Sequence, residues 1–287
     1  MPSSWESLDE HWKQRAQYEV KEDPTKIEAN ICALRALVQG EKGLYSRTDD
    51  TFLLTFLRAR KHNVNEAFKM LENFYEMKES FPEHLEPYLP SEKSNIYDIE
   101  GMTVLEQKDD DERAVVIIRV ENTDFRKVTV EECFQVITTV ILFCCEDQYV
   151  QISGITVIVD LKGFGFRHAI HATPKTLSLF IKMFQGSFPL RLKSVHIVNH
   201  PKLFAPFFAL AKQFMKEKLR RRIHFHGTDM SSLHTHVPYE ILPQQLGGML
   251  PNFNFTSFRN KLQQHEDKIA AWRKYGYGKK PQEDTQN

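Results

Sequence analysis

The sequence predicts an α/β protein in which an N-terminal three-helix bundle is followed by a larger domain with a mostly parallel sheet. Up to about residue 85, apolar residues recur at the spacing of amphipathic helices. From about residue 100, short apolar runs alternate with amphipathic stretches, which is the pattern of β-α-β units. Between the two patterns lies the proline-rich stretch SFPEHLEPYLPSEKS, and such a stretch is typical of a domain boundary.

Three amphipathic helices are expected in the N-terminal part. The first helix follows Asp23-Pro24. The second is capped by Asp49 or Asp50, and the third by Asn65. Short polar side chains of this kind accept hydrogen bonds from the free N–H groups at the start of a helix. Each helix has one apolar face, so the three are expected to pack together as a small bundle.

The larger domain is expected to contain the strands MTVLEQ, RAVVIIRV, GITVIVDLKG, KSVHIVNH and RRIHFHG. Helices are expected over 131–146, 174–186 and 202–219. The runs AVVII and ITVIV are continuously apolar, as strands are when both faces of a parallel sheet are covered. These patterns divide the chain into a helical module (1–85), an α/β domain (92–255) and a polar tail (256–287). The tail ends in KKPQEDTQN and is expected to be disordered.

Composition excludes some classes of function. The 38 basic and 38 acidic residues cancel, so nothing in the net charge points to nucleic acid. No apolar run reaches the roughly 18 residues that a membrane span requires. The N-terminus lacks the layout of a signal peptide, and the 4 cysteines form no C-x-x-C pattern. A cytoplasmic location is therefore expected.

The segment 202–219 carries the first functional signal. Its first half is apolar around most of the helix circumference, which is typical of a central core helix or of a lid between a greasy ligand and a membrane. Its second half is cationic, with only Glu217 against the cations. Cations also favour helix C-termini and solvated faces, but a greasy stretch followed by a cationic one is the layout of an interfacial anchor. The cations are Lys212, Lys216, Lys218, Arg220, Arg221 and Arg222.

Large apolar residues are the second signal. The chain has 21 phenylalanines, and many fall on the predicted helices 131–146 and 174–186 or flank the strands. Core packing explains any single one of them. Their collective excess favours an apolar chamber that a hydrophobic molecule fills.

Signals for catalysis are weak. The chain has no G-x-S-x-G elbow and no phosphate-binding loop, and the dinucleotide-like Gly163-Phe-Gly165 is followed by His168 at the third glycine position. The pairs His224-x-His226 and His234-x-His236 lie on different elements without a third ligand nearby, so structural histidines are favoured over zinc ligands. The run Asp109 to Asp111 is interpreted as a solvated hairpin turn. The chain is therefore expected not to be an enzyme and to need no cofactor or metal.

Several motifs resemble one known family. FLLTFLRARKHNVNEAFKML is similar to the N-terminal module of CRAL-TRIO proteins. GITVIVDLKGFGF, SFPLRLKSVHIVN and KEKLRRRIHFHG followed by LPQQLGG are similar to their lipid-binding domain. The resemblance covers about residues 20 to 255 and is strongest to the branch of α-tocopherol transfer and cellular retinaldehyde-binding proteins. It implies a helical bundle packed on a lipid cage, with a helical gate at 202–219.

The resemblance also implies two sets of site residues. In this branch, basic residues beside the gate bind phosphoinositide headgroups and drive ligand release. The matching positions are Arg60, Lys69, Arg191, Lys193, Lys218 and Arg222. Positions that match the lipid cage are Phe134, Ile137, Val140, Ile141, Ile155, Val159, Phe166, Phe180, Met183, Phe184, Leu190, Val195, Phe204, Phe207, Ala211 and Met215.

The function expected from these signals is that of a carrier. It binds one hydrophobic molecule, such as a tocopherol, retinoid, carotenoid or similar isoprenoid, and exchanges it at membranes that contain phosphatidylinositol bisphosphate. Tocopherol binders have small hydroxyl residues where this chain has Ile137 and Ile141, so the cargo stays open. Association with the membrane is expected to be peripheral and reversible. The alternative is a phosphoinositide-binding adaptor without transported cargo.

Overall fold

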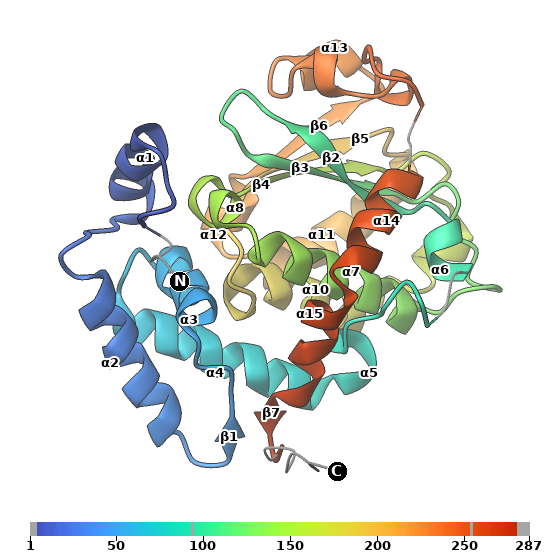
Figure 1. The fold of residues 1–287 in the computed structure, drawn as a ribbon. Helices are drawn as coiled ribbons and strands as arrows, with labels where there is room; N and C mark the ends of the chain where they lie inside the picture. The colour runs from blue at the N-terminus through green and yellow to red at the C-terminus, as the bar shows by residue number, and fades with distance from the viewer. Residues whose placement is uncertain (1–4, 93–94, 253–254, 280–287) are drawn as a thin grey trace.

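The computed structural model describes residues 5–92, 95–252 and 255–279. Figure 1 shows a twisted sheet with helices packed against one face, short segments against the other, and the N-terminal helices beside this arrangement. The predicted α/β class with a mostly parallel sheet is confirmed. None of the helices in the described parts of the chain combines the length and apolarity needed to cross a membrane.

The N-terminal part is helical, as predicted. Its helices are α1 (Glu10–Val20), α2 (Ile27–Gly40), α3 (Asp50–Ala59), α4 (Val64–Ser80) and α5 (Pro82–Leu85), with the short strand β1 (Leu44–Tyr45) between α2 and α3. The three predicted helices correspond to α2, α3 and α4, and their apolar faces share one core. The helix α1 lies apart from that core, against α8 (Gln148–Ser153), through a small cluster of its own.

Helix caps follow the sequence signals with one exception. The Asp49 side chain caps α3 by accepting a hydrogen bond from the backbone N–H of Phe52, at 3.1 Å. The prediction that Asn65 caps the next helix is wrong. Asn63 caps α4 by accepting from the backbone N–H of Glu66 at 3.1 Å, because the helix begins two residues earlier than expected. The same residue type was available at both positions, and the sequence pattern did not distinguish them.

The main sheet has the strand order β2-β3-β4-β5-β6. Only β2 runs antiparallel to its neighbour, β3; the other pairs are parallel. The strands are β2 (Met102–Lys108), β3 (Ala114–Arg119), β4 (Ile155–Asp160), β5 (Leu192–Val198) and β6 (Ile223–Gly227). The turn between β2 and β3 contains the predicted Asp109 to Asp111 run. Asp109 is not solvated, however: it is buried and accepts a hydrogen bond from the Thr156 hydroxyl at 2.7 Å.

The two faces of the sheet have different covers. Alternate residues of β3 and β4, such as Val115 and Ile158, pack against short segments that follow β6. The intervening residues, such as Val116 and Val157, face a cavity. The covering segments are α13 (Met230–His234) and the 3-10 turns Tyr239–Ile241 and Gln244–Leu246. Because both faces are covered at β3 and β4, these two strands are apolar along most of their length, as the sequence pattern indicated.

Helices line the cavity side. These are α7 (Val130–Cys145), α10 (Pro174–Lys182) with a π turn at Met183–Ser187, α11 (Ala205–Phe214) after a 3-10 turn at Lys202–Phe204, and α12 (Glu217–Arg220). The prediction of one continuous helix over 202–219 is wrong: Met215 is extended, with φ −87° and ψ 130°, and separates α11 from α12. We call residues 202–215 the gate segment. The remaining short helices are α6 (Asn95–Asp98) and α9 (Phe166–Ala169).

The C-terminal segment corrects a further expectation. Residues 255–279 are folded as α14 (Phe255–Gln264), α15 (Glu266–Ala271), the 3-10 turn Trp272–Lys274 and β7 (Gly276–Tyr277). Figure 1 shows this segment running from the sheet back to the N-terminal helices, where β7 pairs with β1. The Lys78 ammonium donates to the carbonyls of Trp272 and Tyr275 at 2.6 and 2.7 Å. Trp272 is buried in the N-terminal core, which gives the segment an apolar anchor despite its polar composition. The rest of the predicted tail, 280–287, lies outside the described residues.

Candidate functional site

An apolar cavity lies between the sheet and the helices α7, α10 and α11. It consists of two adjoining pockets of about 320 Å³ and about 240 Å³. Both pockets are lined by Ile137, Leu161 and Phe180, so the two pockets lie side by side. All residues that line the second pocket are apolar. The apolar lining of the second pocket disfavours water and suits apolar ligands.

Three layers of the fold shape the second pocket. The strands β3, β4 and β5 form the floor, α7 and α10 form one wall, and Phe208, Ala211 and Met215 of the gate segment close it. The start of α7 is fixed by a capping box, in which Thr129 and Glu132 each bond to the other's backbone N–H group. The gate segment is also held at its end: the Gln185 amide donates to the Phe214 carbonyl at 2.8 Å and accepts from the backbone N–H of Lys216.

Most of the predicted cage residues lie at this cavity. Phe134 lines the first pocket only. The second pocket is lined by Ile137, Val140, Ile141, Ile155, Val159, Phe180, Phe184, Leu190, Val195, Phe204, Ala211 and Met215.

Three predicted cage residues lie elsewhere, which corrects the expectation for their positions. Phe166 begins α9 and is 77% exposed. Met183 is buried in the N-terminal core, because the π turn at the end of α10 rotates it away from the cavity. Phe207 packs its ring 6.0 Å from that of Phe164 and lines neither pocket.

The sequence reasoning missed a further set of lining residues. Met102, Ile118 and Leu177 line both pockets, and Phe125 lines the first. The strand residues gave no usable signal, because a strand that is apolar on both faces does not indicate which face meets a cavity. The first pocket also contains polar groups. Its His168 is held between the Thr123 carbonyl and the Gly165 N–H, and burial lowers the pKa of the imidazole.

Basic residues lie close enough to one another beside α12, at one end of the sheet, for their charges to interact. We call this set of side chains the basic cleft; its members are Arg60, Arg191, Lys193, Lys218 and Arg222. Burial and the positive charges of Arg222, Arg60, Lys61 and Arg191 lower the pKa of Lys218, which indicates that these cations crowd one another. Burial also lowers the pKa of Arg60, Arg191 and Arg222. A cluster of crowded, partly desolvated cations favours a bound anion.

One glycine brings two members of the basic cleft into position. Gly154, between α8 and β4, has φ +88°, and a Cβ atom there would lie 2.3 Å from the carbonyl oxygen of Arg191. Glycine therefore permits the close approach of the chain at the start of β5, which carries Arg191 and Lys193. The remaining predicted headgroup residue, Lys69, lies on α4, is 60% exposed and pairs with Glu72 at 3.3 Å. Its side chain belongs to the exposed surface of α4.

Comparison with known proteins identifies the family of this fold. Residues 99–248 match the CRAL/TRIO domain, and residues 15–73 match the CRAL/TRIO N-terminal domain. The chain belongs to the CRAL/TRIO family. Proteins of this family are carriers of lipophilic ligands rather than enzymes. Both matched ranges fall inside the predicted divisions 1–85 and 92–255, and the division itself stays a prediction.

The relatives of this CRAL/TRIO chain are similar over most of their length. Alpha-tocopherol transfer protein-like from Homo sapiens is 33% identical over 262 residues, which are 91% of this chain and 77% of that protein. Clavesin-2 from Rattus norvegicus is 32% identical over 259 residues, 88% of this chain and 78% of that protein. The crystal structure of Sfh5 has a TM-score of 0.50 at 15% identity and covers 91% of this chain and 98% of that chain, a likeness in fold alone.

The two histidine pairs of this CRAL/TRIO chain were expected to lie apart on different elements, but three of their four members lie together. His224, His226 and His236 gather with His196 on the face of the sheet away from the cavity, with neighbouring ring centroids about 5 Å apart. The His196 Nδ1 lies 3.0 Å from His226 Nε2. Several of the rings stack, and within the described residues no group of three or more His, Cys, Asp or Glu side chains could hold a metal ion.

Proposed function

We propose that this chain carries one hydrophobic small molecule in the apolar cavity and exchanges it at membranes that contain phosphoinositides. The observation that carries the proposal is the second pocket, which is lined by apolar residues alone. A ligand that buries roughly 500 Å² of apolar surface there would gain about 12 kcal/mol before the costs of association. Tocopherols, retinoids, carotenoids and similar isoprenoids belong to this chemical class.

The membrane half of the proposal rests on the surface around the gate segment. Phe166 and Ile170 are 77% and 70% exposed, and the ring of Phe164 nearby contacts Phe204 and Phe207 of the gate segment. Exposed aromatic and aliphatic groups next to a ligand cavity suit shallow insertion into a lipid interface. Phe166, which the sequence assigned to the cage, is therefore proposed to face the bilayer. Association of this kind is peripheral and reversible, at the cytoplasmic surface.

The basic cleft is proposed to bind the anionic headgroup. Among the described residues, Arg60, Lys218 and Arg222 make no ion pair with a carboxylate, so they are available to a phosphate. A headgroup can favour opening of the gate segment only if it binds the open state more tightly than the closed one. Lys218 lies in α12 and Arg222 follows it, shortly after the break at Met215, which links the cleft to the gate in the chain.

Cargo and membrane binding can be tested separately. Solvent extraction of the purified protein and mass spectrometry should recover a stoichiometric hydrophobic molecule. In flotation with vesicles that contain phosphatidylinositol bisphosphate, Lys218→Ala with Arg222→Ala should bind about 30-fold more weakly, since each cation contributes about 1 kcal/mol. Ligand occupancy should not change. The matched control is Lys26→Ala with Arg126→Ala, which removes two exposed cations that do not belong to the cleft.

The alternative function, an adaptor without cargo, predicts a different result. An adaptor would bind the same vesicles through the same cations but transfer nothing. A carrier loaded with a fluorescent retinoid should deliver it to acceptor vesicles, and delivery should rise when these contain the phosphoinositide. Absence of any extracted molecule, together with no uptake of retinoid or tocopherol, would refute the carrier proposal.

A further inference from the structure

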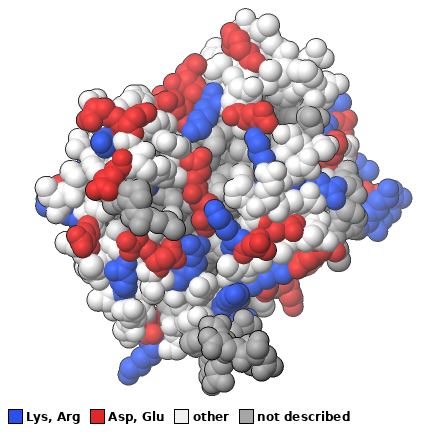
Figure 2. Space-filling view, viewed as in Figure 1, with Lys and Arg blue, Asp and Glu red and all other residues white. Residues whose placement is uncertain are grey.

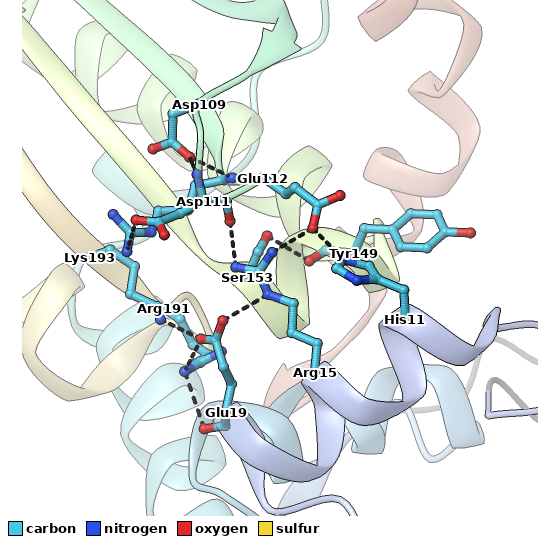
Figure 3. Close-up of polar contacts among 11 residues, drawn as sticks. His11, Arg15, Glu19, Asp109, Asp111, Glu112, Tyr149, Ser153, Arg191 and Lys193 are labelled. Carbon is cyan, nitrogen blue, oxygen red and sulfur yellow. Dashed lines mark hydrogen bonds and ion pairs between the residues drawn. The ribbon is translucent and has the colours of Figure 1, made fainter. Parts of the chain in front are cut away.

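One carboxylate already occupies part of the basic cleft. Glu19, near the end of α1, accepts hydrogen bonds from Arg191 at 3.2 Å and from the Lys193 ammonium, both through Oε2. Its other oxygen accepts from Arg15 Nε at 2.8 Å. Figure 3 shows Glu19 pointing from α1 between Arg15 on one side and Arg191 on the other. Three cations, Arg15 from α1 and Arg191 and Lys193 from the start of β5, thus surround a single carboxylate.

This carboxylate is ionised and largely shielded from solvent. Burial alone would raise the pKa of Glu19, but hydrogen bonds to Lys193 and Arg15 and the charges of Lys193 and Arg191 outweigh burial and lower the pKa. The side chains of Glu19, Arg191 and Lys193 are 16%, 13% and 20% exposed. Charge-assisted hydrogen bonds in such surroundings are strong, and a phosphate oxygen makes the same kind of bond.

The basic cleft therefore has two halves. In the open half, Arg60, Lys218 and Arg222 pair with no carboxylate among the described residues, and the buried Nε of Arg60 has no hydrogen-bond partner there. In the occupied half, Glu19 neutralises Arg191 and Lys193, although the buried Nη1 of Arg191 has no partner among the described residues either. Arg191 and Arg222 act on each other through their charges, so the two halves adjoin.

The support of Glu19 does not depend on the cleft. Arg15 donates to Glu112 at 2.7 Å and to the carbonyl of Asp111, so the β2–β3 turn holds Arg15 independently of Glu19. On its other side α1 packs against Ile152 through Leu8, Trp12, Ala16 and Val20. The Glu19 side chain can consequently leave Arg191 and Lys193 by rotating its own torsions, while α1 stays docked.

We propose that Glu19 is an internal competitor for the anion of the basic cleft and sets how many phosphates a headgroup needs. This rests on the proposed headgroup site. A headgroup with one phosphomonoester binds in the open half and leaves Glu19 bound to Arg191 and Lys193. A headgroup with two phosphomonoesters places the second in the occupied half and displaces Glu19. The affinity gained from a second phosphate is then reduced by the free energy of the bonds that Glu19 loses to Arg191 and Lys193.

The test is Glu19→Gln, which keeps the size of the side chain and removes its charge. Flotation uses phosphatidylcholine vesicles with a small fraction of either phosphatidylinositol bisphosphate or phosphatidylinositol monophosphate. The variant should bind the bisphosphate vesicles about 10-fold more tightly and the monophosphate vesicles less than about 2-fold more tightly. The control is Glu10→Gln on the same helix, where the carboxylate is 77% exposed and, within the described part of the chain, pairs with Lys13 alone. It removes the same charge and should change neither affinity.

The outcomes separate this inference from the proposed function. If wild type binds phosphoinositide vesicles through Lys218 and Arg222 but Glu19→Gln binds them no more tightly, the competitor role is overturned and the headgroup site stands. Equal gains on both vesicle types would mean a general charge effect and would also overturn it. If neither protein prefers phosphoinositide vesicles, both proposals fail. Glu19→Asp, which keeps the charge and shortens its reach, should lie between wild type and Glu19→Gln.

The source of the anion is tested in the same system. Soluble inositol trisphosphate carries the same phosphomonoester pair without a lipid. Calorimetric titration of wild type and Glu19→Gln should give a gain similar to that on bisphosphate vesicles, because the competitor acts on the phosphates and not on the acyl chains. Soluble binding as tight as vesicle binding would identify the free inositol phosphate as the ligand. If Glu19→Gln binds neither the soluble inositol phosphate nor the vesicles more tightly than wild type does, the proposal is overturned.

Discussion

The apolar cavity and the basic cleft lie close together in the chain, but they differ in how strongly each depends on individual residues. The cavity is lined by residues whose contacts are interchangeable, since any apolar side chain of suitable size covers the same surface. The cleft depends on individual partners: one glutamate, 172 residues away in sequence from Arg191, neutralises half of it. On the face drawn in Figure 2, acidic and basic side chains are interspersed over much of the surface. Charge recognition in this protein is therefore local.

The difference affects what each region can tolerate. A cavity wall keeps its function when one apolar residue replaces another, but fails when its volume is filled. A substitution in the basic cleft leaves its shape largely unchanged but alters its affinity for an anion when one charge is lost. The reason is that each cation either has a particular carboxylate as its partner or has none. The predictions below use this contrast, beginning with the volume of the cavity.

The largest effect is expected from filling the cavity. Ala211, on the gate segment, is buried and lines the second pocket, so Ala211→Trp should occupy the ligand's space and reduce ligand binding by more than about 100-fold, about 3 kcal/mol. The measurement is binding of a fluorescent retinoid, with the melting temperature as a check on folding. Ala209→Trp is the matched control, because Ala209 lies on the same helix but is exposed. Unchanged binding by Ala211→Trp would mean that the cargo lies elsewhere.

The sequence predicted the cavity better than the cleft for a physical reason. Ile137, Val140, Ile141 and Cys144 recur at helical spacing, and that spacing alone puts them on one face of α7. No local pattern links Glu19 to Arg191, because their contact exists only after α1 docks against α8 and β5 forms.

The local sequence pattern also failed to predict structure where a few buried side chains fold a segment of polar composition. The segment 255–279 reads as polar, yet Phe255, Phe258, Leu262 and Trp272 are buried, and these few anchors are enough to fold it. The break at Met215 in the gate segment was missed for a similar reason. Every residue around it is compatible with a helix, and it is the bonds of Gln185 to both sides that stabilise the extended conformation.

An acid titration should distinguish the carboxylate of the cleft from a structural one. Glu22, three residues after Glu19, forms a fully buried, two-pronged ion pair with Arg58, at 2.6 and 2.7 Å. Burial would raise the Glu22 pKa, but the bonds and charges of Arg58 and His62 outweigh it and lower the pKa to about 2. A carboxylate whose pKa is lowered by folding stabilises the folded state at any pH above its ordinary, unfolded-state pKa. This stability is lost as the pH falls toward the folded-state pKa.

Because the Glu22 pKa is lowered by folding, acid should destabilise the protein through this residue. Between about pH 4.5 and about pH 2, the chain should lose about 3 kcal/mol of unfolding free energy through Glu22. Urea unfolding at a series of pH values should show Glu22→Gln less stable than wild type at neutral pH, with the difference shrinking toward zero in acid. Glu19→Gln is the comparison variant and should lose far less stability at neutral pH. A stability difference for Glu22→Gln that does not vary with pH would contradict the assignment.

The smallest effect is expected at the end of the gate segment. Gln185→Ala removes one hydrogen bond to the Phe214 carbonyl and one to the Lys216 N–H, which together hold the break between α11 and α12. The loss should cost about 1 kcal/mol, and because these bonds exist only in the closed gate, it should appear as roughly 5-fold faster ligand release.

The measurement is the rate at which a loaded retinoid moves to acceptor vesicles without phosphoinositide, where opening is not assisted by a headgroup. Gln213→Ala, on an exposed position of the same helix, is the control and should release ligand at the wild-type rate. If Gln185→Ala releases no faster, the gate does not open at the Met215 break, and the hinge has to be sought at its other end near Asn199. If it releases faster and also loses its response to phosphoinositide, the headgroup acts by weakening this same connection. Cavity and cleft would then be coupled through one amide side chain.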